Sequence, residues 1–202
     1  MSDEPFRILL VCTGNICRSP LAERLLRAGL AAGLGPDAAD TYHVSSAGTR
    51  AWEGSPMDRT AARELRRLGG DPAGFRSRQL VAAHVEATDL VLTATVAHRS
   101  VVLSEAPAAL RRTFTIRELA ALAAALTPEG DLARLVAQAA ASRGAVPIDD
   151  LDVIDPYGAP AHVHRDVADQ LSTAMSQLVR LMLRVRWPKG PRAESANLRT
   201  RR

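Results

Sequence analysis

Short apolar runs alternate with helix-forming segments along this chain, and that alternation constrains its fold more than any other feature. The first run, FRILLVC, is typical of a strand buried on both faces of a sheet. Strands that alternate with helices in this way indicate a parallel α/β sheet. We predict the strands at Phe6–Cys12, Tyr42–Ser46, Leu90–Thr93 and Thr113–Ile116.

Helical periodicity and capping residues place helices between and after these strands. Ser19 is predicted as the N-cap of the first helix, because serine favours that position and Pro20 suits the first helical residue. Thr127 and Pro128 give the same signal for a later helix. The predicted helices are Ser19–Gly33, Met57–Leu68, Ser77–Ala83, Arg117–Leu126, the segment from Thr127 to Gly144, and about His162–Arg186.

Size and composition indicate one globular domain. A chain of 202 residues can bury roughly 70% of its unfolded surface, so it needs no disulfide or metal to fold. Its two cysteines exclude a disulfide scaffold and favour a reducing, cytoplasmic location. No stretch reaches the ~18 apolar residues of a membrane helix. The acidic start, MSDEPFR, is unlike a signal peptide.

The net charge of +4 resides in residues 187–202, a polar tail, and the rest of the chain is balanced. A nucleic-acid-binding domain carries its basic surplus within the fold, so we expect no nucleic-acid partner. We interpret residues 1–186 as the domain and residues 187–202 as a basic, disordered tail.

The junction between the first strand and the first helix carries the strongest chemical signal, VCTGNICRSP. A loop that enters a helix N-terminus points several backbone N–H groups into one concavity, which suits an anion. Cys12 stands at the mouth of that loop, where such dipoles stabilise a thiolate. Arg18 offers a planar fork for phosphate oxygens. Gly14 and Asn15 tolerate the tight backbone that the loop requires.

Other phosphate-loop and metal interpretations do not fit this junction. The Walker pattern needs a lysine in the loop, and the only lysine of the chain is Lys189. The dinucleotide pattern GxGxxG is absent. Two cysteines and scattered histidines do not form a zinc-ligand pattern, so we predict no metal and no cofactor.

A second signal, IDPYG, precedes the last predicted helix. Pro156 disfavours helix at Asp155 and so indicates a loop. Asp-Pro alone is a common turn signal, but beside a cysteine that accepts a phosphoryl group, Asp155 is the natural general acid.

VCTGNICRSP and DPYG together resemble the low-molecular-weight protein tyrosine phosphatases, and the resemblance covers most of residues 6–186. It implies an α/β fold with a four-stranded parallel sheet and helices on both faces. It also implies that Cys12 is the nucleophile, Arg18 the phosphate clamp and Asp155 the general acid.

The same resemblance assigns supporting roles. Ser19 matches the serine that steadies the thiolate, and Asn15 with Ser46 matches the pair that holds the loop in shape. Trp52 and Tyr157 match the aromatic walls of the substrate cleft. Cys17 matches a partner cysteine that can trap Cys12 as a reversible disulfide. The predicted substrate-binding set is Thr13, Gly14, Asn15, Ile16, Cys17, Ser19, Trp52 and Tyr157.

The chain departs from the family pattern in two places. The segment before Asp155 is longer than usual, and we predict a helical insertion at about residues 117–146. After the third predicted strand, the chain has Thr93, Ala94 and Thr95 where the family usually has Met-Asp. Both departures concern the surface around the site.

The function predicted is removal of phosphate from protein phosphotyrosine through a cysteinyl-phosphate intermediate. Protein-arginine phosphatases are an alternative, although they typically carry threonine at the position of Ile16. Arsenate reductases of this fold are a second alternative, but they need further cysteines. A catalytically silent phospho-ligand binding module is a third, which the intact Cys12, Arg18 and Asp155 disfavour.

Overall fold

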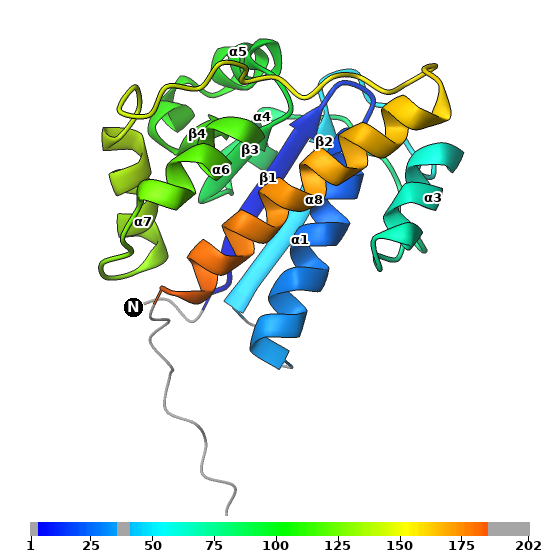
Figure 1. Cartoon of the computed structure of the whole chain (residues 1–202). Helices are drawn as coiled ribbons and strands as arrows, with labels where there is room; N and C mark the ends of the chain where they lie inside the picture. The colour runs from blue at the N-terminus through cyan, green and yellow to red at the C-terminus, as the bar shows by residue number, and fades with distance from the viewer. Residues whose placement is uncertain (1–3, 36–40, 186–202) are drawn as a thin grey trace, which may run out of the picture.

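The computed structural model describes residues 4–35 and 41–185 (Figure 1). A parallel sheet of four strands, in the order β2-β1-β3-β4, lies at the centre of one α/β domain. The predicted fold class is therefore confirmed. The strands are β1 Phe6–Cys12, β2 Tyr42–Gly48, β3 Leu90–Thr93 and β4 Thr113–Thr115.

Strand β1 is buried on both faces, as its apolar sequence predicts. Ile8 and Leu10 join the larger apolar cluster on one side, whereas Leu9 and Val11 join the smaller cluster on the other side. Successive side chains of a strand point to opposite faces, so this division follows from the alternation along β1.

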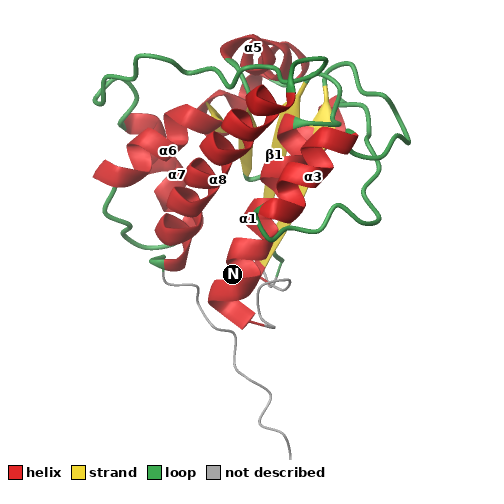
Figure 2. Ribbon diagram, turned by 45° about the vertical axis from the view of Figure 1, so that its right-hand side comes forward, coloured by secondary structure: helices red, strands yellow, loops and turns green. Residues whose placement is uncertain are grey.

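Helices cover both faces of the sheet. One face carries α1 (Arg18–Leu34), α3 (Arg59–Arg67), α6 (Ile116–Ala125) and α8 (Ala161–Leu183), as Figure 2 shows. Helix α8 packs against the other three helices of this layer. The opposite face carries the short α4 (Ala82–Glu86), α5 (Val96–Glu105) and the 3₁₀ helix η2 (Pro107–Arg112). Helix α7 (Leu132–Ala141) packs against α6 and η2.

Two predicted helix starts are wrong. Helix α1 begins at Arg18, so Ser19 is inside the first turn and is not the N-cap. Its hydroxyl instead contacts the Cys12 thiol and accepts from the side-chain amide of Asn15. Helix α7 begins at Leu132 after an Asp131 cap, and not at Thr127-Pro128. In both places a good capping residue was available, but another residue starts the helix.

The segment predicted as a helix at Ser77–Ala83 is largely extended. Gly48 donates its N–H to the carbonyl of Arg78 and accepts from the N–H of Leu80, so this segment pairs with the end of β2 through an isolated parallel bridge. Only Ala82–Glu86 is helical. Helix α5, which the periodicity did not predict, follows β3 directly and is capped by the side chain of Thr95.

Residues 117–146 contain most of α6 and all of α7, and that they are an insertion stays a prediction. Arg143, just after α7, donates to the carbonyls of Leu110 and Thr113 and so joins this segment to η2 and β4. The predicted basic tail, residues 187–202, lies outside the described residues. Within residues 4–35 and 41–185, no helix is long and apolar enough to cross a membrane.

Candidate active site

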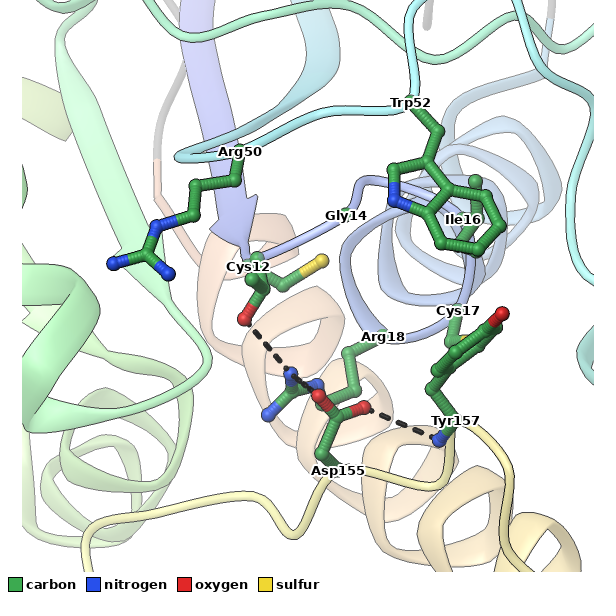
Figure 3. Close-up of a pocket in the computed structure, with 10 residues that line it drawn as sticks. Cys12, Gly14, Ile16, Cys17, Arg18, Arg50, Trp52, Asp155 and Tyr157 are labelled. Atoms are coloured by element: carbon green, nitrogen blue, oxygen red, sulfur yellow. Dashed lines mark hydrogen bonds and ion pairs between the residues drawn. The ribbon is translucent and has the colours of Figure 1, made fainter.

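A cavity of about 210 Å³ opens where β1 ends and α1 begins (Figure 3). Its walls come from the loop after β1, the loop after β2 and the loop before α8, which the parallel sheet places at one edge. The lining residues are Cys12, Thr13, Gly14, Ile16, Cys17, Arg18, Arg50, Trp52, Asp155 and Tyr157. Of the predicted site residues, Asn15, Ser19 and Ser46 are buried behind this wall.

The loop from Cys12 to Arg18 turns its carbonyl groups away from the cavity. The carbonyl oxygens of Cys12 and Thr13 accept from the N–H groups of Thr49 and Arg50 at 2.9 Å each. Those of Gly14 and Ile16 accept from the loop residues Trp52 and Asp58. Among the described residues, the N–H groups of positions 13–17 donate to no protein atom. The loop therefore offers a group of free amide donors for an anion.

Asn15 holds this loop in shape from behind. Its φ of +54° lies in the left-handed region, which asparagine tolerates better than most residues. The side-chain amide donates to the hydroxyls of Ser19 and Ser46, at 2.9 Å each, and its oxygen accepts from the N–H of Arg78 at 2.9 Å. Three elements therefore converge on one fully buried side chain.

The thiol of Cys12 is buried and faces a hydroxyl. Its Sγ lies 3.0 Å from the Ser19 Oγ. That oxygen already accepts from Asn15, so the Ser19 hydrogen is free to be donated to the sulfur. A donated hydrogen bond, together with the N–H groups at the helix start, stabilises a thiolate.

Arg18 is nearly fully buried and is held by three groups. Its Nη1 donates to the Val153 carbonyl at 3.1 Å, and its Nη2 donates to the Thr13 hydroxyl at 3.3 Å. The same Nη2 lies 2.6 Å from a carboxylate oxygen of Asp155. The buried Nε has no partner among the described residues, so it remains available to an anion.

Asp155 and two aromatic rings form the outer part of the cavity. One oxygen of Asp155 accepts from the N–H of Tyr157 at 3.2 Å, which fixes the turn around Pro156. The rings of Trp52 and Tyr157 meet edge to face, with centroids 5.1 Å apart. Each of these two side chains is 52% exposed, so an apolar face is open to a substrate.

Cys17 lies in the same loop but in a different environment. Burial, followed by the negative charge of Asp58 and by Cys12, raises the pKa of the Cys17 thiol well above its usual range. Cys17 therefore stays protonated at neutral pH. A protonated thiol is a poor nucleophile.

Three residues of the site were not predicted from the sequence. Arg50 lines the cavity opposite Trp52. Its place in the sequence between Ser46 and Trp52, two predicted site residues, could have indicated it. Gly48 lets β2 approach the loop, because a Cβ there would clash with the carbonyl oxygen of Thr13. His98 contacts Thr13 from α5, a helix that the sequence reasoning missed. Within the described part of the chain, no cluster of three or more His, Cys, Asp or Glu could hold a metal.

Comparisons with known proteins identify relatives of this chain. The sequence pattern of the family described as low molecular weight phosphotyrosine protein phosphatase matches residues 7–127. A protein-arginine-phosphatase of Geobacillus stearothermophilus is 32% identical over 174 residues, which are 86% of this chain and 94% of that protein. Low molecular weight protein-tyrosine phosphatase A of Mycobacterium tuberculosis is 45% identical over 93 residues, which are 45% of this chain and 53% of that protein.

A solved structure shows the same fold. The low molecular weight protein tyrosine phosphatase from T. tengcongensis superposes with a TM-score of 0.66 at 31% identity, and the match covers 87% of this chain and 98% of that chain. The family pattern spans more than half of the chain, and the Geobacillus relative aligns along nearly its whole length. On these grounds the chain belongs to the low molecular weight protein-tyrosine phosphatase family and is a cysteine-dependent phosphatase.

Proposed function

We propose that the protein removes phosphate from phosphotyrosine in other proteins, with Cys12 as the nucleophile. The observation that carries the proposal is the cavity itself. It combines the Cys12 thiol, free amide donors, the buried guanidinium of Arg18 and the exposed aromatic pair Trp52–Tyr157. Such a cavity fits an aryl phosphate: the phosphoryl group would lie in the loop and the ring against the aromatic wall.

In the first step, the Cys12 thiolate attacks phosphorus and forms an S–P bond. The P–O bond to the tyrosine breaks, and its electron pair leaves with the phenolic oxygen. Asp155 donates a proton to that oxygen. A bound phosphoryl group would take over the Arg18 guanidinium from Asp155, which frees the carboxyl group to face the leaving oxygen.

In the second step, Asp155 takes a proton from a water molecule that attacks phosphorus. The S–P bond breaks, inorganic phosphate forms, and Cys12 returns to the thiolate. Arg18 and the loop N–H groups stabilise the charge on the equatorial oxygens in both steps. No group outside the chain and the water is required. The reaction would take place in the cytoplasm, where both thiols stay reduced.

Phosphoarginine is the second candidate substrate, because the Geobacillus relative is a protein-arginine-phosphatase. The residue that favours phosphotyrosine here is Ile16, which lines the cavity with an apolar side chain. A guanidinium group would leave N–H donors unpaired against Ile16, and an unpaired buried donor costs about 1–3 kcal/mol. A phenyl ring carries no such donors.

The test compares kcat/KM on two peptides of one sequence, phosphorylated on tyrosine or on arginine. We expect wild type to prefer phosphotyrosine, and Ile16→Thr to shift the ratio toward phosphoarginine by about tenfold to a hundredfold. Val101→Thr, at an exposed position of α5 outside the cavity, is the matched control and should leave the ratio unchanged. A wild-type preference for phosphoarginine would contradict the assignment, and no turnover of either peptide would favour a silent binding module.

A further inference from the structure

His98 connects helix α5 to the phosphate loop through both ring nitrogens. Its Nε2 lies 2.9 Å from the Thr13 hydroxyl, which lines the cavity, and its Nδ1 lies 2.6 Å from the Thr95 hydroxyl. The ring is buried in the fold, beside the carboxyl edge of the sheet. None of the roles assigned above uses this residue.

The contact extends from His98 to the proposed phosphate clamp. The Thr13 hydroxyl that meets His98 also accepts from Arg18 Nη2 at 3.3 Å. One hydroxyl therefore lies between the imidazole and the guanidinium. Arg18 is held by that hydroxyl, by the Val153 carbonyl and by Asp155, and in the proposed function Asp155 would release Arg18 when a phosphoryl group binds.

Either neutral tautomer of His98 satisfies both hydroxyls, and we consider the one that is protonated on Nε2. Thr95 Oγ1 accepts from the His98 backbone N–H at 3.2 Å, so its own hydrogen is free to be donated to Nδ1. Nδ1 is then an acceptor, and the ring proton is on Nε2, which donates to Thr13. The neutral ring fits its surroundings, because burial and the charge of Arg18 lower the pKa of His98 to about 4.

In this arrangement the Thr13 oxygen accepts two hydrogen bonds, from His98 and from Arg18. Its own hydrogen is therefore not used by either neighbour and can be donated into the cavity that Thr13 lines. A phosphoryl oxygen bound in the loop is the acceptor that the cavity would supply.

We propose that His98 is a positioning residue for phosphate binding: by donating to Thr13, it holds Arg18 in place and directs the Thr13 hydroxyl hydrogen toward the bound phosphoryl group. The proposal rests on Arg18 as the phosphate clamp of the proposed function. It adds α5, on the far face of the sheet from α1, to the elements that control the site.

Two amide substitutions separate the two contacts of the ring. In His98→Asn the side-chain amide can reach Thr95, where Nδ1 lies, but it is too short to reach Thr13. In His98→Gln the amide N–H can reach Thr13, where Nε2 lies. The readouts are kcat and KM on an aryl phosphate, the inhibition constant of inorganic phosphate, and the midpoint of thermal unfolding. His43→Asn, at an exposed position of β2, is the matched control.

We expect His98→Asn to weaken phosphate inhibition and to lower kcat/KM, each by about five- to tenfold, within the range for the net loss of one hydrogen bond. His98→Gln should recover most of this loss, and His43→Asn should match wild type. Equal losses in the two His98 variants, or a loss that tracks thermal stability, would overturn the proposal. An inactive wild type would instead contradict the proposed function.

A double-substitution cycle with Thr13→Val tests the route through the hydroxyl. If His98 acts through Thr13, His98→Asn should change phosphate inhibition by less than about twofold once Thr13 is already valine. The double variant should then resemble Thr13→Val alone. Effects that multiply would show that His98 acts by another route, and the proposal would be wrong.

Discussion

Two thiols five positions apart in one loop differ in what surrounds them. Cys12 faces the Ser19 hydroxyl and the free amides of the loop, whereas Cys17 is buried near Asp58. The raised pKa of Cys17 also bears on the disulfide that the family resemblance implies. A thiol attacks oxidised sulfur as its thiolate, so a Cys12–Cys17 bond should form slowly at neutral pH and faster as the pH rises.

Iodoacetate should therefore modify Cys12 and spare Cys17 at neutral pH. The expected product carries one carboxymethyl group on Cys12, and inorganic phosphate should protect against it. In Cys12→Ser the remaining thiol should react at least about tenfold more slowly, because a protonated thiol is a poor nucleophile. Peptide mass spectrometry measures both rates. Comparable rates for the two cysteines would contradict the assigned environments.

At the scale of elements, helix α5 makes the folding stability of the domain depend on pH through His98. His98 is held neutral in the folded protein, with a pKa of about 4, whereas an unfolded histidine has its ordinary pKa of 6.5. Between these values the unfolded state binds the extra proton and the folded state does not. Folding stability from this residue is therefore complete above pH 6.5 and is lost as the pH falls toward 4.

The direction of this pH dependence can be measured by comparing wild type with His98→Gln. The free energy of unfolding of wild type should fall more steeply between pH 6.5 and 4, by at least about 1 kcal/mol over the interval. The charged groups that act on His98 are Arg18, Asp155 and Asp152, and both proteins contain them. Parallel profiles in urea unfolding would show that His98 is not held neutral by the fold.

The elements that were predicted well are those whose buried positions follow a clear apolar pattern in the local sequence. Strands β1 and β3 begin and end at the predicted residues, because an apolar run buried on both faces stops where its apolar residues stop. Helix α8 is close to its prediction because its apolar positions recur over many turns. Short elements without such a pattern, α5 and the bridge at Gln79, were missed or misread.

The candidate site divides in a similar way. The residues that carry the proposed chemistry lie in two compact motifs, and motif and spacing were enough to predict that they come together. Gly48 and His98 contribute through contacts across the fold, at distances in sequence that no local pattern reports. For Ser19 the helix pattern and the family resemblance predicted different contacts: the hydroxyl does not cap the helix, but it lies against the Cys12 thiol as the resemblance implies.

For the whole molecule, the parallel sheet is what assembles the site. Cys12 ends β1, Trp52 follows β2, His98 follows β3 and Asp155 precedes α8, and all of these positions lie at the carboxyl edge of the sheet. Ligands bind at this edge in open α/β sheets, where strand order reverses around the first strand. The remainder of the domain, including the layer of α1, α3, α6 and α8, holds these loops in place.

The central claim is that phosphate passes through Cys12. Its most direct test is to mix Asp155→Ala with an aryl phosphate whose leaving group needs no proton and to quench the reaction within the first turnovers. Mass spectrometry then locates the phosphoryl group bound to the protein. Without Asp155 to activate water, we expect phosphocysteine at Cys12 to accumulate, with no bound phosphoryl group in Cys12→Ala. The general-acid contribution is typically 10²–10⁴-fold, so Asp155→Ala should lose that much on phosphotyrosine and far less on this substrate. A phosphoryl group on any other residue of Asp155→Ala, or steady turnover by Cys12→Ser, would contradict the account.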